Sequence, residues 1–477
     1  MLRHGRGLLT VNALVLGALA IGFLNNVIIA AIFGLTRRVD AFFAASMLPS
    51  LFMALCVDYL GKNFLPVLAS AKHESAESAS TLTSSVVTIM GLFATGVAVL
   101  LVAFSGPLFK LLLPGFENEE AVLVSRYFAI MAPAIVFMAI NTFHEYVWQY
   151  EERFVYVSAS RLALPAANLA GMLLCAPFAG EYCLPIGFLA GHVTVFFMLL
   201  ARVPYRYRPR IVIRPDLERR VFTNSAIVMS TGLIARTKSI IMNYLGSTLG
   251  GGAIAALALA SKLTEPLERS AFSGLRMVMF SHTAKLFVER NERLLGEVYA
   301  AGLCISFLLL APLLWWVTLN GGEIVRVFFQ RGEFTPEMAA LVTGAVVGLT
   351  PSVLFVGLNQ LLTNAFYAMD KVKVPAIVMP FGTVIYVGAA VPLGALLGTL
   401  GLALATTITA ALTFVVLFMC LAGVLRELHP LRTAFRLIGY SLLGAAVMIV
   451  ATELIKALGA PQFFVAAASL PLGAAIY

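Results

Sequence analysis

Apolar segments of about 20 residues or more follow one another along this 477-residue chain, with only short polar breaks between them. A helix needs about 20 apolar residues to cross a bilayer. No segment shows the alternation of apolar and polar residues typical of a membrane β-barrel. The pattern predicts an all-α polytopic membrane protein with about fourteen transmembrane helices, at 8–34, 41–69, 81–105, 121–149, 154–177, 182–202, 221–246, 252–284, 294–319, 337–369, 374–397, 400–425, 432–453 and 458–477.

Composition agrees with this pattern and adds an orientation. Hydrophobic residues make up 60% of the chain and charged residues only 12%, against about 25% charged in soluble domains. The net charge of +9 comes largely from the segment 202–220, which holds seven arginines. Basic loops stay on the cytoplasmic side. We therefore expect a cytoplasmic N-terminus without a cleavable signal, basic residues that could hold anionic headgroups, and no nucleic-acid site.

The sequence repeats itself at a fixed offset of 218 residues. Six identities fall within one short stretch at this offset: Phe116 with Phe334, Ala121 with Ala339, Leu123 with Leu341, Pro133 with Pro351, Phe137 with Phe355 and Asn141 with Asn359. An even number of spans per repeat keeps both repeats in the same membrane orientation. We predict two parallel six-helix repeats around a central cationic cavity: residues 1–202 and 221–425, a basic linker at 203–220, and two additional helices at 426–477.

One predicted span carries most of the candidate chemistry. Within 252–284, Lys262, Glu265, Arg269 and Arg276 recur at steps of three, four and seven, which places them on one helical face. Ionisable residues at bilayer depth are costly and generally face a water-filled cavity, a counter-charge or a charged substrate. We therefore expect this face to line a hydrophilic cavity that accepts an anionic substrate.

Further cations lie inside neighbouring spans, namely Arg236, Lys238 and Arg161, and Asp40 and Glu268 are among the acids near them. Simple internal pairing is an open alternative, since Lys262 with Glu265 and Glu265 with Arg269 have the spacing of helical neighbours. It does not account easily for the surplus of cations, because an unpaired buried charge costs several kcal/mol. An anionic phosphate or carboxylate passing through the cavity would account for them.

Prolines inside spans suggest where helices bend. Pro133 and Pro351 are related by the repeat, and Pro266 lies in the charged span. Each removes a backbone hydrogen bond and can kink a helix. We predict that they act as hinges in a rocking motion; the alternative is that proline is simply commoner in membrane helices.

Enzyme, metal and cofactor motifs are absent from the sequence. It contains no P-loop, HExxH or GxSxG pattern, and its five cysteines have no metal-binding spacing. Cys175 and Cys183 flank one short loop, so a disulfide between them stays an open alternative to two free thiols. We expect a non-enzymatic transporter with no cofactor, driven by an H⁺ or Na⁺ gradient, the membrane potential or substrate gradients.

Several motifs carry a family resemblance. The stretch after Gly22 reads GFLNNVIIAAIFGLTRRVDAFFAASMLPSLF, followed by GKNFLPVLA, FFQRGEFTPEMAAL and NAFYAMDKVKVP. These motifs resemble those of MurJ/MviN-type lipid flippases of the MOP superfamily, over nearly the whole chain. The resemblance implies export of a polyprenyl-diphosphate-linked saccharide, with a cationic cavity around the diphosphate, in a bacterial cytoplasmic membrane. Membrane lipids are expected partners, as are a polysaccharide polymerase and glycosyltransferases.

The family's charged positions are only partly retained. Asp40 matches the aspartate of the D-A-F motif, Lys262 matches a central arginine and Glu265 its neighbouring glutamate, whereas Asn25 and Asn26 replace an Arg-Asp pair. Family arginines also fall on Leu19, Met53 and Ala54. These losses favour a different lipid-linked glycan, such as an exopolysaccharide repeat unit, with lipid II as the alternative. A cation-coupled drug exporter, which would prefer an acidic cavity, and a non-transporting scaffold, which needs no cavity charges, fit less well.

Overall fold

The computed structural model describes residues 2–53, 58–201, 203–211, 237–289, 291–371, 373–425 and 430–457. Within these ranges the regular structure is helical, with no β-strand. The predicted span at 458–477, most of the span at 221–246 and the second part of the basic linker lie outside the described residues. The all-α prediction is confirmed.

The helices follow the hydropathy pattern closely. In chain order they are α1 (Leu2–Phe33), α2 (Arg37–Phe52), α3 (Asp58–Glu74), α4 (Ala76–Ala103), α5 (Ser105–Leu112), α6 (Asn118–Tyr150), α7 (Phe154–Ala179), the 3-10 turn η2 (Gly180–Tyr182), α8 (Cys183–Leu200), a helical stretch at 237–248, α10 (Ala253–Val288), α11 (Glu292–Phe329), α12 (Pro336–Ala368), α13 (Lys373–Val424) and α14 (Pro430–Ala457).

Eight helical stretches in the described part of the chain are long and apolar enough to cross a membrane. Two of these, 154–200 and 373–424, each hold two of the predicted spans. Within the predicted span at 41–69, the structure describes α2 and α3, and residues 54–57 between them lie outside the described residues. The span of α10 is not among the eight, since its first half is interrupted by charged residues.

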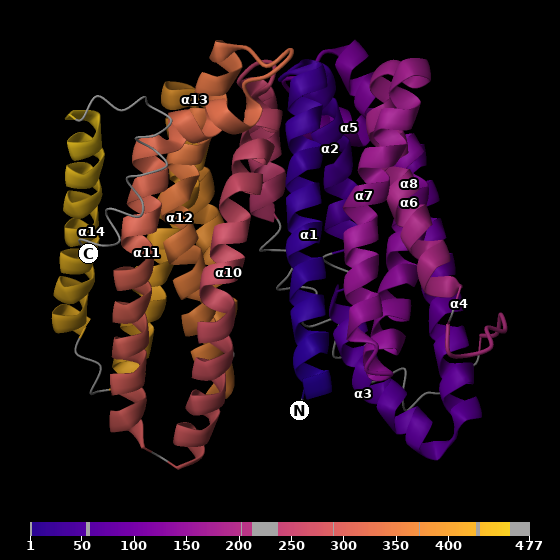
Figure 1. Cartoon of the computed structure of the whole chain (residues 1–477), viewed down its shortest axis with the longest axis horizontal. Helices are drawn as coiled ribbons and strands as arrows, with labels where there is room; N and C mark the ends of the chain where they lie inside the picture. Colours follow the sequence, from indigo (N-terminus) through magenta and orange to yellow (C-terminus); the bar gives the residue numbers. More distant parts are fainter. Residues whose placement is uncertain are drawn as a thin grey trace. The chain divides into compact units, whose positions relative to one another are not determined.

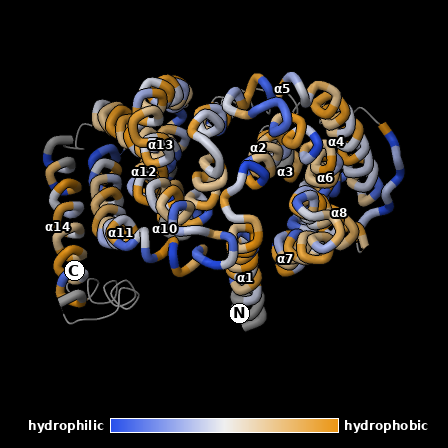
Figure 2. Tube along the Cα trace, turned by 90° about the horizontal axis from the view of Figure 1, so that it is seen from above, coloured by the Kyte–Doolittle hydropathy of each residue, from blue (hydrophilic) through white to orange (hydrophobic). Residues whose placement is uncertain are grey.

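By their contacts, the helices form two compact units. Unit 1 comprises residues 1–29 and 36–248, and unit 2 comprises 30–35 and 249–477. Figure 1 shows the helices of each unit as long rods, and Figure 2 shows hydrophobic residues on the helices of both units. In unit 1, a core around Phe64 and Phe143, whose rings meet edge to face at 5.3 Å, joins α3, α4 and α6. In unit 2, a hydrophobic core joins α10, α11, α12, α13 and α14.

Backbone geometry repeats at the same offset as the sequence. Helices α6 and α12 are both 33 residues long and begin 218 residues apart. Three pairs of positive-φ residues obey this offset: Gly34 with Gly252, Glu152 with Asp370, and Gly180 with Gly398. Non-glycine residues rarely adopt positive φ, so the match of Glu152 (55°) with Asp370 (57°) is specific. Over this stretch, the two repeats therefore share their turns as well as their helices.

Side-chain contacts repeat as well. Asn141 donates a hydrogen bond from its side-chain amide to the carbonyl oxygen of His192 at 3.0 Å, and Asn359 donates the equivalent bond to Ala410 at 2.9 Å. The rings of Phe137 and Phe196 lie 5.2 Å apart, and those of Phe355 and Phe414 lie 5.9 Å apart. Each residue of the first repeat in these contacts lies 218 positions before its counterpart in the second repeat. The duplication predicted from the sequence therefore extends to the packing inside each repeat.

The short connection after α1 packs within unit 2, although α1 up to Ile29 belongs to unit 1. There the carbonyl oxygen of Ala31 accepts a hydrogen bond from the backbone N–H of Glu333 at 2.9 Å. In unit 1, the N–H of Gly115 donates to the hydroxyl of Ser247 at 3.2 Å. Gly115 and Glu333 are 218 residues apart and therefore equivalent in the two repeats. In each unit, the backbone N–H at this loop position donates a hydrogen bond to a residue near the end of another helix.

The first part of the basic linker forms a strap, residues 203–211, along one face of α4. The Ser80 hydroxyl donates to the carbonyl oxygen of Arg206 at 3.1 Å, and the Arg208 N–H donates to the Ser84 hydroxyl at 3.2 Å. Tyr207 shares a hydrogen bond with Thr88 at 3.0 Å. The three α4 residues are four apart, so they lie on one helical face, and the strap is held at successive turns.

A tyrosine of the strap also contacts α6. The Tyr205 hydroxyl lies 3.0 Å from the imidazole Nε2 of His144 on α6. Burial raises the pKa of the Tyr205 phenol above its ordinary value of 10.0, and the neighbouring Tyr207 adds to the effect. The phenol therefore stays neutral and keeps its hydrogen bond at ordinary pH, while the linker arginines Arg206, Arg208 and Arg210 remain exposed.

Candidate functional site

The charged face of α10 is built on a helix with a backbone interruption. Pro266 lies inside α10, four residues after Lys262. Because proline has no N–H, the carbonyl oxygen of Lys262 lacks its helical donor. The ammonium of Lys262 lies 3.8 Å from the carboxylate of Glu265, and both side chains are nearly half exposed. The pairing of these two residues, which the sequence left as an open alternative, is present in the structure, and Pro266 removes one helical hydrogen bond beside it.

A second charged residue of α10 is tied to the neighbouring helix. Gln360 on α12 donates a hydrogen bond from its side-chain amide to the carboxylate of Glu268 at 2.8 Å. Further along α10, Arg276 is half-buried and faces Gln360 and Asn364 of α12. The side chain of Arg269 lies outside the described residues. The polar face of α10 is thus joined to α12, which the sequence did not indicate.

In unit 1 the candidate charges are paired or buried. Arg161 on α7 forms an ion pair with Glu145 on α6 at 3.4 Å. Arg161 was expected among the surplus cations, so this pairing reduces that surplus by one. Asp40 on α2 is fully buried and has an interaction partner. Nearby, Arg37 contacts Glu120 at 3.3 Å and lies over the ring of Phe116 at 5.2 Å.

The two asparagines that replace the family's Arg-Asp pair have different surroundings. Asn26 donates a hydrogen bond to the carbonyl oxygen of Gly22 within α1 at 2.7 Å. Asn25 instead lines a small cavity of about 20 Å³ together with Asn168 on α7. The amide oxygens of both residues are buried without a hydrogen-bond partner. A cavity of this size holds about one water molecule, which would satisfy the two oxygens.

The remaining candidates are placed by the helices alone. Lys238 is half-buried in the helical stretch at 237–248, whereas Arg236 lies outside the described residues. Pro133 and Pro351 lie inside α6 and α12, at equivalent positions of the two helices. Their role as hinges stays a prediction. Cys175 and Cys183 are free thiols, so the disulfide is not formed.

Sequence reasoning missed Gln360, Thr363 and Asn364 on α12 and Asn168 on α7. Each is a single polar residue in an apolar span, which is weak evidence taken alone. The spacing of 360, 363 and 364 was an available signal, because residues three and four apart share one helical face.

Solved structures share this fold. A protein described as "Lipid II flippase MurJ, inward closed conformation" superposes with a TM-score of 0.79 at 18% identity, covering 98% of both chains. An inward-facing multidrug resistance MATE family transporter of the MOP superfamily superposes with a TM-score of 0.71 at 16% identity, covering 86% of this chain and 95% of that one. The fold places the chain in a class of multi-pass helical proteins that share this architecture.

The sequence comparisons narrow this class to one family. The family described as "Lipid II flippase MurJ" matches residues 29–470, and the chain therefore belongs to the MurJ family. A "Probable lipid II flippase MurJ" of Buchnera aphidicola subsp. Acyrthosiphon pisum is 26% identical over 77% of this chain and 74% of the relative. The "Lipid II flippase MurJ" of Burkholderia cenocepacia is 24% identical over 87% of this chain and 83% of the relative.

Proposed function

We propose that the chain is a flippase that moves a polyprenyl-diphosphate-linked saccharide across the bacterial cytoplasmic membrane, with lipid II as the first candidate substrate. The observation that carries the proposal is the family match over residues 29–470, because relatives with similarity across most of this chain are described as lipid II flippases. The earlier preference for an exopolysaccharide unit finds no support in these relatives.

The charged face of α10 gives the proposal a physical basis. Lys262 and Glu265 form an ion pair in which both side chains remain accessible. A diphosphate approaching Lys262 can replace the carboxylate of Glu265, because charge-assisted hydrogen bonds to phosphate are strong. When the diphosphate leaves, Glu265 can take its place again. Such an exchange keeps Lys262 neutralised both with and without substrate, which lowers the cost of a charge at membrane depth.

Energy for transport would come from outside the chain. We propose an alternating-access cycle in which the repeats at 1–202 and 221–425 rock about Pro133, Pro351 and Pro266. With the N-terminus in the cytoplasm, outward movement of an anionic lipid is favoured by a membrane potential that is negative inside, at about 2.3 kcal/mol per charge per 100 mV. Coupling to an H⁺ or Na⁺ gradient is the alternative source.

A second candidate substrate, an exopolysaccharide repeat unit on the same type of carrier, rests on a separate observation. Asn25 and Asn26 stand where the resembling flippases carry an Arg-Asp pair. The Asn25 amide oxygen faces a cavity of about 20 Å³, too small for a sugar or a phosphate. Substrate contacts at the first helix would therefore be weaker, and selection for the lipid II saccharide less strict.

Complementation distinguishes the two substrates. Cells depleted of their lipid II flippase should survive when this chain is expressed, and Lys262→Ala at equal protein level should not rescue them. Lys285→Ala on the same helix is the matched control, since Lys285 pairs with Glu289 at 4.0 Å and is largely exposed. Absence of rescue by the unaltered chain, together with loss of surface polysaccharide when its gene is deleted, would reject lipid II in favour of the second substrate.

A further inference from the structure

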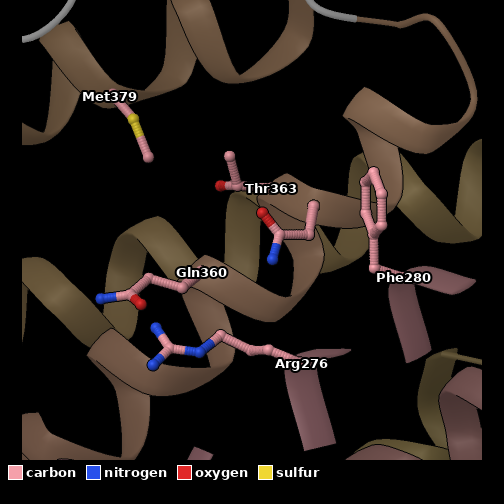
Figure 3. Close-up of a pocket in the computed structure, with 6 residues that line it drawn as sticks. Arg276, Phe280, Gln360, Thr363 and Met379 are labelled. Atoms are coloured by element: carbon pink, nitrogen blue, oxygen red, sulfur yellow. The ribbon is translucent and has the colours of Figure 1, made fainter. Parts of the chain in front are cut away.

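An open cavity of about 440 Å³ in unit 2 is lined by residues of α10, α12 and α13 (Figure 3). This volume falls in the range of small-molecule sites. It is distinct from the Lys262–Glu265 pair, because neither residue lines it. Its lining combines charged, polar and apolar side chains: Arg276, Phe280, Gln360, Thr363, Asn364 and Met379.

Arg276 supplies a positive charge for which the described residues provide no ion-pair partner. Among the residues that the structure describes, none forms a hydrogen bond or an ion pair with its guanidinium. The carboxylate of Glu268, one of the acids on the same helix, is engaged by Gln360. Figure 3 shows Gln360 beside the Arg276 guanidinium. A half-buried guanidinium without a counter-charge in the described residues can accept an anionic ligand through charge-assisted hydrogen bonds.

Thr363 provides a second, independent indication of a ligand. Its side chain is only 5% exposed, and its hydroxyl has no hydrogen-bond partner. Several other buried threonines in unit 2 donate to the carbonyl oxygen four residues before them, as Thr350 does to Val346 at 2.7 Å and Thr409 to Ala405 at 2.7 Å. A buried unsatisfied hydroxyl costs about 1–3 kcal/mol. Because Thr363 lines the cavity, a bound ligand can satisfy it.

The donors in this cavity suit a phosphate oxyanion. A guanidinium, the Asn364 amide and the Thr363 hydroxyl all offer protons to acceptor oxygens, and Arg binds phosphate in bidentate geometry. Phe280 and Met379 form an apolar side of the same cavity, which suits the glycerol or acyl part of a lipid. Inorganic phosphate has no apolar group that could contact that side.

The position of Arg276 along α10 fits a lipid headgroup. Arg276 lies about 35 Å along the helix from Ala253, at 1.5 Å per residue. The hydrocarbon core of a bilayer is about 30 Å thick. A helix that enters the bilayer near Ala253 therefore brings Arg276 to the opposite headgroup layer, where lipid phosphates are concentrated.

We propose that Arg276, Thr363 and Asn364 form a binding site for the phosphate of a membrane lipid headgroup inside unit 2, separate from the Lys262 site. Two lipids carry this chemistry: an anionic phospholipid, and the polyprenyl diphosphate carrier. Occupancy by the carrier rests on the proposed function, whereas occupancy by a phospholipid does not.

The test is lipid binding by the purified full-length chain in detergent, followed as a shift in melting temperature. The probes are short-chain phosphatidylglycerol, phosphatidylcholine, polyprenyl diphosphate and inorganic pyrophosphate. We expect phosphatidylglycerol or polyprenyl diphosphate to stabilise the chain, and Arg276→Gln to weaken that binding about tenfold or more. Arg293→Gln, which removes an exposed arginine of unit 2 outside the cavity, should bind as the unaltered chain does.

Thr363→Val separates a ligand contact from a structural role. Because the hydroxyl has no partner in the protein, its removal should leave the unliganded melting temperature unchanged or higher, while lipid binding weakens several-fold. Equal lipid binding by Arg276→Gln, Thr363→Val and the unaltered chain would overturn the proposal, as would equal stabilisation by phosphatidylcholine. Stabilisation by pyrophosphate alone would also overturn it, by reducing the site to a simple anion site.

The same experiment identifies the lipid and stays independent of transport. Stabilisation by polyprenyl diphosphate in preference to phosphatidylglycerol assigns the site to the carrier, and the reverse assigns it to the surrounding membrane. Lys262→Ala should retain headgroup binding at the Arg276 site. If this variant binds normally while the unaltered chain fails to rescue flippase-depleted cells, the function proposal fails and the headgroup site stands.

Discussion

The side-chain amide of Asn359 donates to the carbonyl oxygen of Ala410 at 2.9 Å and so ties α12 to α13. The equivalent bond from Asn141 to His192, at 3.0 Å, ties α6 to α8 in unit 1. Each asparagine also has an amide oxygen that is buried without a partner. The bond recurs although one acceptor residue is histidine and the other alanine, because the acceptor is a backbone carbonyl and imposes no side-chain identity.

We expect Asn359→Ala and Asn141→Ala each to lower the free energy of unfolding by about 0.6 kcal/mol and at most about 1.7 kcal/mol, the average and the maximum for hydrogen bonds between membrane helices. Thermal unfolding in detergent measures the loss. Asn320→Ala is the control, because Asn320 is equally buried and its bond, to Trp316 at 3.0 Å, stays within one helix. A loss for Asn320→Ala as large as the other two would contradict a special contribution of the interhelical bonds.

Gly180 and Gly398 should resist substitution for a backbone reason. Their φ angles are 52° and 59°, with ψ of −128° and −133°, a region that only glycine adopts easily. A Cβ at either position would meet no atom within 4 Å. Gly→Ala at each site should therefore lower the melting temperature through strain alone, at a cost of about 1–3 kcal/mol.

Gly96 provides the comparison for this prediction. It lies within α4, and a Cβ there also meets no atom within 4 Å. Gly96→Ala should raise stability or leave it unchanged, because alanine favours helix over glycine by about 1 kcal/mol. Opposite shifts for Gly96 and Gly398 would confirm the prediction, and equal shifts would contradict it.

Transport should depend on the charge at Lys262. We expect Lys262→Ala to reduce translocation of a labelled polyprenyl-diphosphate glycan in vesicles by about tenfold or more, and Lys262→Arg to retain most of it, since both cations bind phosphate. Glu265→Gln should have a smaller effect, because Lys262 keeps its charge. Normal translocation by Lys262→Ala would remove this residue from the substrate path.

The hinge prediction is tested by measuring the translocation rate and the melting temperature of proline variants separately. Pro133→Ala and Pro351→Ala restore a backbone donor inside α6 and α12. If the two prolines act as hinges, each variant should slow translocation several-fold while its melting temperature is unchanged or higher. Pro312→Ala inside α11 is a control outside the predicted hinges. Slower transport by all three variants to the same degree would argue against a specific hinge role.

The strap should be released when its contacts on α4 are removed. Ser84→Ala combined with Thr88→Val deletes the hydroxyls that hold Arg208 and Tyr207. We expect trypsin to cut the double variant several-fold faster at the strap arginines than it cuts the unaltered chain. Thr95→Val, whose hydroxyl bonds only to Gly91 within α4, should leave the cleavage rate unchanged.

The sequence predicted the helical class and the duplication well, because span length and a fixed offset are properties of the chain itself. The pair Lys262–Glu265 was also predictable, since both residues lie on one helix at i, i+3 spacing. Pairs formed between residues on different helices were not predictable from the sequence. Glu268 with Gln360 and Arg161 with Glu145 depend on which helices pack together and how each is rotated, and hydropathy contains neither quantity.

The strap can follow α4 only where the spacing of its residues matches the spacing of the helical turns. Two residues of extended chain advance about 6.6 Å and four residues of helix about 6.0 Å. Alternate strap residues can therefore meet every fourth α4 residue over two or three turns, before the two spacings drift apart by more than a hydrogen bond tolerates. A one-residue insertion between Tyr205 and Arg208 would turn the Arg208 N–H away from Ser84 while Tyr205 stays against His144, whereas a two-residue insertion would keep the direction of that N–H.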